Sequence, residues 1–323
     1  MKTLVRIGTR RSKLSLWQAN HIAELIVRHH PSARIEIREF TTRGDATPTA
    51  PLPAIGGKGL FTEALEAALR NGEIDCAVHS LKDLPVEDAA GLAIGAIPRR
   101  EDQRDVLVSR SASSLADLPT GARIGTGSLR RRAQLLAMRP DLEVVSIRGN
   151  IPTRVGLLDD AERQLDAVVL AAAGLIRLGM NEHIREIFAP AQMLNAAGQG
   201  ALAVQCRADA EARAFFAPLN DPATALAATA ERAFLRGLEG GCSLPVGACA
   251  HFQGGGLRLQ GRVIAIDGSH QLDLIGEAAM TENRERLETA RKLGADLALQ
   301  ALEQGAGSLL PNLTNRGAAA DKP

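Results

Sequence analysis

The order of apolar and polar residues in the first hundred positions predicts alternating strands and helices. An apolar run at residues 3–8 predicts a strand, and residues 14–26 repeat apolar side chains at helical spacing. A second strand around 35–37, a helix at 60–69 and a strand at 75–78 follow. This β-α-β-α-β order is typical of a parallel sheet with right-handed crossovers.

The same order begins again near residue 123. The predicted elements are a strand at 123–125, a helix at 128–138, a strand at 142–147, a helix that starts near Pro152 and a strand at 166–170. Ile7-Gly8-Thr9 opens the first block and Ile124-Gly125-Thr126 opens the second. We therefore expect two similar α/β domains that enclose a cleft.

The pattern changes after Pro222 and indicates a third, smaller domain. A helix runs to about residue 238, and a closing helix covers about 281–303. Between them lie three alternating segments, two of which are joined by the hairpin signal Asp267-Gly268. We expect an α+β domain followed by a frayed polar tail.

Composition narrows the possible functions. The 323 residues are 45% hydrophobic and 23% charged, so the chain can bury sizeable cores and is not generally disordered. A net charge of +1 and 2% aromatic residues argue against nucleic acid binding, so any anion binding is local. The longest apolar stretch, residues 167–176, is too short to cross a bilayer. The cysteine and histidine spacings predict no disulfide and no metal.

Arginine recurs where predicted strands end. Ligands of open α/β sheets bind at the carboxyl ends of the strands, and a guanidinium group matches a carboxylate or phosphate. The sequence therefore predicts a ligand with several anionic groups. Each arginine taken singly has the alternative of being solvated or paired with an Asp or Glu of the next turn. The polar residues in question are Arg10, Ser12, Ser128, Arg130, Arg131, Arg148 and Arg154.

Two further residues are candidates for chemistry. Asp83 follows a short buried strand and is a candidate acid, base or cation stabiliser, although a loop salt bridge with Lys82 explains it equally well. Cys242 lies in the glycine break at 238–245, where a thiol is reachable and nearby arginines could stabilise the thiolate. The other three cysteines lie in apolar runs and are expected to be core thiols. Neither a complete P-loop nor a dinucleotide fingerprint is present.

These segments together resemble the porphobilinogen deaminase family nearly from end to end. The matching motifs, in family order and spacing, are Thr9-Arg10-x-Ser12, Thr42-Arg43-Gly44-Asp45, residues 56–61 (GGKGLF), residues 79–85 (HSLKDLP), Ser128-Leu129-Arg130-Arg131, Arg148-Gly149-Asn150 with Thr153-Arg154, Gly198-Gln199-Gly200 and residues 238–242 (LEGGC). Gly127 departs from the pattern because many relatives have serine there, and this puts one hydroxyl contact in doubt.

The resemblance implies a fold of three domains. Residues 1–98 with 196–218 would form the first α/β domain and residues 103–193 the second. Both would be doubly wound and similar to the lobes of bilobal periplasmic binding proteins. Residues 220–310 would form an α+β domain with a three-stranded antiparallel sheet, and residues 311–323 a flexible tail.

The resemblance also implies an activity. A dipyrromethane cofactor, joined by a thioether to Cys242, would prime the addition of four porphobilinogen molecules with loss of four ammonia molecules. Hydrolysis would then release hydroxymethylbilane for tetrapyrrole synthesis. A cytoplasmic monomer with no nucleic acid, membrane or metal partner is expected. The competing hypothesis is a non-enzymatic bilobal receptor for a small polyanion.

The family pattern assigns roles to residues of this chain. Asp83 would be catalytic, opposing the positive charge that develops when ammonia leaves and when the pyrroles are coupled. The residues implied to bind the cofactor are Cys242, Lys82, Asp83, Ser128, Arg130 and Arg131. Those implied to bind substrate are Arg10, Ser12, Phe61, Arg148, Arg154 and Gln199.

Overall fold

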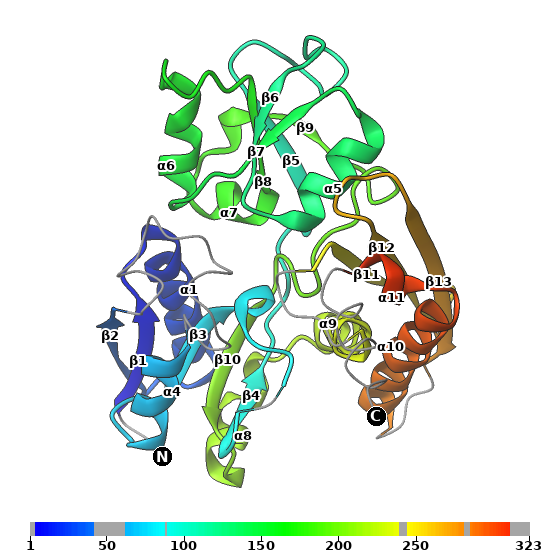
Figure 1. The fold of residues 1–323 in the computed structure, drawn as a ribbon. Helices are drawn as coiled ribbons and strands as arrows, with labels where there is room; N and C mark the ends of the chain where they lie inside the picture. The colour runs from blue at the N-terminus through cyan, green and yellow to red at the C-terminus, as the bar shows by residue number, and fades with distance from the viewer. Residues whose placement is uncertain (1–3, 42–61, 88, 239–243, 281–284, 311–323) are drawn as a thin grey trace, which may run out of the picture. The chain divides into compact units, whose positions relative to one another are not determined.

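The computed structural model (Figure 1) describes residues 4–41, 62–87, 89–238, 244–280 and 285–310. The chain divides into two compact units. The first unit consists of residues 1–103, 173–179 and 198–225. The second consists of residues 104–172, 180–197 and 226–323. The chain therefore passes between the units several times, and each unit is built from segments that are distant in sequence.

The first unit contains a five-stranded sheet of order β2-β1-β3-β10-β4. Strand β1 runs parallel to β2 and β3, whereas β10 is antiparallel to both β3 and β4. Helices α1 and α8 pack on one face of the sheet and α4 packs on the other. The bounds are β1 Leu4–Arg10, α1 Lys13–His29, β2 Arg34–Phe40, α4 Glu63–Arg70, β3 Cys76–Ser80, β4 Leu92–Ala96, β10 Leu202–Arg207 and α8 Ala210–Phe216.

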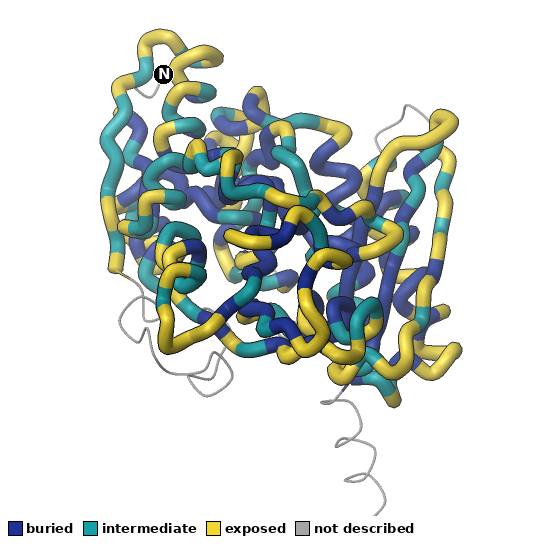
Figure 2. The backbone as a smooth tube through the Cα atoms, turned by 90° about the horizontal axis from the view of Figure 1, so that it is seen from above, coloured by how far each residue is buried: buried dark blue, intermediate teal, exposed yellow. Residues whose placement is uncertain are grey.

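Strand alternation explains why both faces of this sheet are covered. In β3, the side chains of Cys76 and Val78 join the core under α1, while Ala77 between them joins the core under α4. Helix α1 contributes Ile22 and Ile26 to the first core, because residues four apart share one helix face. Figure 2 colours the backbone by burial, and stretches of buried residues alternate with exposed ones along the chain.

The second unit repeats this strand arrangement in a sheet of order β7-β6-β8-β5-β9. Strand β6 runs parallel to β7 and β8, and β5 is antiparallel to β8 and β9. Helix α5 contributes Leu135 to the core of this sheet. The bounds are β5 Asp105–Ser109, β6 Arg123–Gly125, α5 Leu129–Met138, β7 Glu143–Val145, α6 Ile151–Gly156, β8 Ala167–Ala171, α7 Ala172–Arg177 (in the first unit except for Ala172) and β9 Ile184–Ile187.

The second unit also holds an antiparallel sheet of order β11-β12-β13. Helices α9 and α10 cover it, and Phe234 of α9 is fully buried in the shared core. Arg262 of β12 joins this part to α5, because it pairs with Asp273 at 2.6 Å and donates to the Gln134 side chain at 3.0 Å. The bounds are α9 Pro222–Gly237 (in the first unit as far as Ala225), β11 Val246–Gln253, β12 Gly256–Ile264, β13 Gln271–Ala279, α10 Arg286–Glu303 and α11 Ala306–Leu309.

The two α/β sheets and the three-stranded antiparallel sheet confirm the predicted fold class. The expectation of parallel sheets was wrong in part, since in each five-stranded α/β sheet four strands run in one direction and one strand, β10 or β5, runs in the opposite direction. Strand β7 is also shorter than expected, and α10 begins at Arg286 rather than near 281. Within the described ranges, no helix is both long and apolar enough to cross a membrane.

The turn between β12 and β13 offers a test of the packing within the second unit. Gly268 has φ +76°, and a Cβ there would lie 2.5 Å from the backbone nitrogen of Ala137 at the end of α5. Gly255, with φ +82° in the preceding hairpin, has nothing within 4 Å of its Cβ position. We expect Gly255→Ala to lower the free energy of unfolding by about 1 to 2 kcal/mol, because alanine is disfavoured in the left-handed conformation.

Gly268→Ala should cost clearly more than Gly255→Ala, because the turn must also move away from α5. Urea unfolding of both variants measures the difference. Equal losses of stability would show that the turn does not pack against α5 in solution.

Candidate active site

In the first unit, two predicted binding residues lie where β1 ends. Arg10 is the last residue of β1, and Ser12 is the N-cap of α1, with its hydroxyl accepting from the Ser15 backbone N–H at 3.1 Å. Serine at this position fixes the start of the helix and keeps the hydroxyl at the strand end. Both side chains are partly exposed. The local sequence therefore places a cation and a hydroxyl at the carboxyl edge of the sheet.

Lys82 and Asp83 lie at the same edge, because β3 is the parallel neighbour of β1. They form the short 3-10 turn η1 (Leu81–Asp83) that directly follows β3. Asp83 is exposed, whereas Lys82 is half-buried and its Nζ lies 3.4 Å from the Gln199 side-chain oxygen. The structure thus brings Arg10, Ser12, Lys82 and Asp83 to one edge of one sheet, as the strand-end rule predicts.

Gln199 is fully buried, and both ends of its amide are bonded within the protein. Its nitrogen donates to the Gln103 carbonyl at 2.7 Å, and its oxygen faces Lys82. Gly200 beside it has φ +83°, and a Cβ would lie 2.4 Å from the Glu101 carbonyl oxygen, so only glycine fits. Gln199 is therefore placed to orient Lys82 in this structure.

His79 supports the same turn from inside the sheet. Burial is the main cause that lowers the pKa of His79 to about 4, with the charge of Arg10 acting in the same direction. The imidazole Nε2 lies 3.0 Å from the Gln205 side-chain oxygen. Next to it, Gln18 of α1 donates to the Ser80 hydroxyl at 2.8 Å. A neutral, bonded His79 fixes the strand end from which Lys82 and Asp83 follow.

In the second unit, the other predicted residues lie at the ends of β6 and β7, which are parallel neighbours. Ser128 is the N-cap of α5, in the place that Ser12 has in the first unit. Arg148 follows β7, and Arg154 of α6 donates through Nε to the Gly149 carbonyl at 2.8 Å. The repeated sequence block thus produces a second edge with a capping hydroxyl and cationic side chains.

Arg148 carries a buried nitrogen whose hydrogen-bonding capacity is unused among the described residues. Its Nη1 is buried and has no hydrogen-bond partner among the described residues. A buried donor without a partner is costly, so an anionic group that accepts from it would be stabilised. This orphaned donor is suited to an anionic acceptor such as a ligand carboxylate.

Arg130 and Arg131 occupy the first turn of α5 and are both buried. Their partner is Asp105 at the start of β5, whose carboxylate lies 2.6 Å from Arg130 Nη1 and 2.8 Å from Arg131 Nη2. They do not pair with an acidic residue of the next helical turn, which was the alternative considered for arginines in this pattern. Nε of Arg130 is buried without a partner in the described part of the chain.

Gly127 is more constrained than its sequence position indicates. A Cβ at this residue would lie 2.8 Å from the Ile147 carbonyl oxygen. Backbone atoms cannot move aside as a flexible side chain can, so a serine here would require the loop to shift.

Two predicted site residues, Phe61 and Cys242, lie outside the described residues. The other cysteines, Cys76, Cys206 and Cys249, are buried, which confirms that they are core thiols. In the ranges that the structure describes, no three His, Cys, Asp or Glu side chains converge on a metal position.

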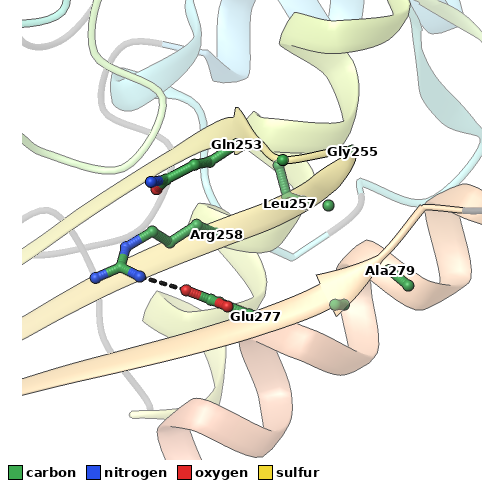
Figure 3. Close-up of a pocket in the computed structure, with 9 residues that line it drawn as sticks. Gln253, Gly255, Leu257, Arg258, Glu277 and Ala279 are labelled. Atoms are coloured by element: carbon green, nitrogen blue, oxygen red, sulfur yellow. Dashed lines mark hydrogen bonds and ion pairs between the residues drawn. The ribbon is translucent and has the colours of Figure 1, made fainter.

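A surface depression of about 490 Å³ lies at the β11–β12 hairpin, and its lining includes none of the predicted site residues that the structure describes (Figure 3). Gln253, Leu257 and Ala279 line it, and Arg258 donates to Glu277 across its floor. Its one ion pair is internally neutral, so it offers no net charge to an anionic ligand.

Sequence reasoning missed several residues that shape these two edges. Asp105 was not singled out, although it directly precedes the apolar run Val106-Leu107-Val108. Arg177 was not among the predicted site residues, yet it donates to the Gly200 carbonyl at 2.6 Å and lies 5.5 Å from the Trp17 ring. Burial lowers the pKa of Arg177 to about 10. An acidic residue at the start of a buried strand was the available signal for Asp105.

Two family models match the chain. Residues 5–214 match "Porphobilinogen deaminase, dipyromethane cofactor binding domain", and residues 225–303 match "Porphobilinogen deaminase, C-terminal domain". The chain is 43% identical over 311 residues to the porphobilinogen deaminase of Syntrophobacter fumaroxidans, covering 96% of this chain and 98% of that protein. It is 44% identical over 316 residues to that of Pelobacter propionicus, covering 97% and 98%.

Among solved structures, the chain is similar to the methionine-binding protein MetQ, with a TM-score of 0.42 and 16% identity over 67% of this chain and 89% of that one. A periplasmic substrate-binding protein from Coxiella burnetii gives a TM-score of 0.42 and 16% identity, covering 68% and 93%.

The buried His79 predicts a pH dependence of stability. Its folded pKa of about 4 lies below the ordinary value of 6.5, so between these values the unfolded chain binds a proton that the folded chain does not. Stability should fall as the pH drops from 6.5 to 4, by about 3 kcal/mol from this group. Above pH 6.5 the contribution is fully present.

The free energy of unfolding, measured in urea, should decrease less between pH 7.5 and pH 4.5 in His79→Gln than in the unaltered protein. His251→Gln is the matched control, because His251 is exposed on β11. If His79→Gln keeps the full acid loss, the imidazole is not the group responsible.

Proposed function

Because this chain belongs to the porphobilinogen deaminase family, we infer that it polymerises porphobilinogen to hydroxymethylbilane in tetrapyrrole biosynthesis. The observation that carries this inference is the match of both family models, which together run from residue 5 to residue 303. At each addition the aminomethyl C–N bond of porphobilinogen breaks and ammonia leaves. The aminomethyl carbon then joins the free α-carbon of the preceding ring, which loses its hydrogen as a proton.

The family's cofactor fits the groups that this chain presents. A dipyrromethane, when bound, supplies the free pyrrole carbon from which the chain is extended. Each pyrrole ring carries an acetate and a propionate, so the ligand is a polyanion. The buried nitrogens of Arg130 and Arg148 that have no partner in the described ranges are donors suited to such carboxylates.

We assign the carboxylate contacts to residues of both sheet edges. The guanidinium groups of Arg10, Arg130, Arg131, Arg148 and Arg154 would pair with the acidic arms, and Ser12, Lys82 and Ser128 would add hydrogen bonds. Phe61 would pack against the terminal ring. Gln199 was expected to bind substrate directly, but its bonded amide supports an indirect role through Lys82. Because the net charge of the whole chain is +1, attraction of a polyanion depends on these local groups.

Asp83 is the residue that we assign to the chemistry. Loss of ammonia leaves an electron-deficient carbon, and coupling creates a positively charged pyrrole. A fixed carboxylate opposes this developing charge and can accept hydrogen bonds from pyrrole N–H groups. Its exposure at the strand end keeps it reachable, and it can pass the proton between the amine and the coupled carbon.

The remaining assignments rest on the family resemblance. We propose three domains, with residues 1–98 and 196–218, 103–193, and 220–310; the tail expected at 311–323 lies outside the described residues. We propose a cytoplasmic monomer that acts on a small-molecule substrate without nucleic acid or membrane partners. Cys242 is proposed as the thioether anchor of the cofactor.

Intact mass tests the activity and the anchor together. The purified protein should be heavier than its sequence by one dipyrrole, and added porphobilinogen should produce increments of one pyrrole. Cys242→Ser should remain folded, weigh only its sequence and show no turnover. Cys249→Ala is the control, because Cys249 is a buried thiol of β11, and it should keep the adduct.

A fully active Cys242→Ser protein would remove Cys242 as the anchor. If the unaltered protein weighs only its sequence and binds porphobilinogen without consuming it, the chain is a receptor and the proposed activity fails.

Replacement of Asp83 separates charge from shape. Asp83→Asn should keep the dipyrrole mass but lower turnover by about 10²- to 10³-fold, as for loss of one preorganised electrostatic group. Glu87→Gln is the control, since Glu87 is an exposed carboxylate four residues later in the same segment. Single-turnover release of ammonia measures the step directly, and an unchanged rate in Asp83→Asn would exclude Asp83 from it.

A further inference from the structure

Two buried arginines of α5 share one buried carboxylate. Asp105, Arg130 and Arg131 are 0%, 3% and 5% exposed. One oxygen of Asp105 accepts from Arg130 Nη1 at 2.6 Å, and the other accepts from Arg131 Nε at 2.9 Å. Consecutive side chains on a helix point in different directions, and Asp105 draws these two guanidinium groups to one point.

The two guanidinium groups are used differently. Arg131 turns Nε and Nη2 toward Asp105 and donates from Nη1 to the Val169 carbonyl at 3.0 Å. Arg130 uses one nitrogen, Nη1, for both Asp105 and the Leu194 carbonyl, each at 2.6 Å. Its Nε remains buried without a partner in the described residues. The open donor therefore belongs to Arg130, in a side chain that is almost completely removed from solvent.

The position in the helix makes this arrangement unfavourable without a nearby anion. The first turn of a helix carries a partial positive charge and ordinarily favours acidic side chains. The first turn of α5 contains no acidic residue and holds both arginines. Asp105 supplies the missing negative charge from β5, and it fixes Arg130 so that Nε is left for another acceptor.

We propose that Asp105 is a positioning residue, which holds the Arg130 guanidinium with its Nε presented to a carboxylate of the bound pyrrole chain. This inference rests on the proposed function and adds a residue that acts only through Arg130. Asp105 itself, a buried anion, would repel the ligand if it approached the pyrrole carboxylates directly.

Charge and orientation predict opposite results when Asp105 is neutralised. Removal of an anion beside an anion-binding site strengthens attraction for carboxylates if only charge matters. Removal of the group that orients Arg130 weakens binding, because the donor is no longer held in place. The sign of the change in affinity therefore separates the two roles.

The experiment uses the protein as purified and follows mass rather than turnover. For Asp105→Asn we expect a lower fraction of molecules isolated with the dipyrrole. We also expect about a tenfold rise in the porphobilinogen concentration that half-saturates the first one-pyrrole increment, the change given by loss of one charge-assisted hydrogen bond. A folded protein with no dipyrrole supports the proposal equally. Full occupancy with an unchanged or lower half-saturating concentration overturns it.

Asp75→Asn is the matched control. Asp75 is also fully buried and also bridges two arginines, Arg6 at 3.2 Å and Arg207 at 3.6 Å, at the opposite end of β1 from Arg10. It should lose stability in urea unfolding without a change in dipyrrole occupancy or half-saturation. An equal loss of dipyrrole occupancy in Asp75→Asn would show that Asp105→Asn acts only by lowering stability, and would contradict the positioning role.

Asp105→Glu decides the case if Asp105→Asn does not fold. It keeps the charge but moves the carboxylate by one methylene, so positioning predicts weaker pyrrole addition and a pure charge effect predicts none. Failure of the proposed function is distinguishable, because the unaltered protein would then show no dipyrrole and no pyrrole increments.

Discussion

Each α/β sheet of this protein depends on one antiparallel strand that is supplied from elsewhere in the sequence. Strand β10 lies between β3 and β4, although more than a hundred residues separate it from β3, and β5 lies between β8 and β9. Without these strands, the parallel strands would leave an open edge of unpaired backbone groups. The placement of β5 also determines which groups meet at the candidate site. Because β5 begins with Asp105, it brings a carboxylate to the arginines of α5.

The candidate site follows from how strands end and helices begin in such sheets. Parallel neighbours β1 and β3 end at one edge, and β6 and β7 end at another, so residues far apart in sequence are brought together within each unit. Ser12 and Ser128 cap the helices that follow, and cations stand beside them. The protein thus offers fixed donors to an acidic ligand while its overall charge stays near zero.

Buried polar groups in this protein fall into two classes that have different consequences. His79 is hydrogen-bonded to the Gln205 side chain, and Gln199 is hydrogen-bonded to Lys82 and to the Gln103 carbonyl. These bonds hold the turn that carries Lys82 and Asp83. Arg130 and Arg148 instead keep buried nitrogens without partners in the described residues. Buried polar groups that are hydrogen-bonded within the protein fix the geometry around them. Buried donors without a partner are instead stabilised when a ligand accepts a hydrogen bond from them.

The sequence by itself determined the periodic elements, the repeated α/β block, the hairpin at Asp267-Gly268 and the family. Hydrophobic spacing, cap residues and local motifs are read within about ten neighbouring positions, so they required no knowledge of the fold. Only the tertiary structure decided which strands are antiparallel and which carboxylate meets Arg130 and Arg131. Asp105 is 25 residues from Arg130 and 26 from Arg131, and no local pattern selects a partner at that distance. That choice is made by strand order, because the neighbours of β5 are fixed only when the whole sheet forms.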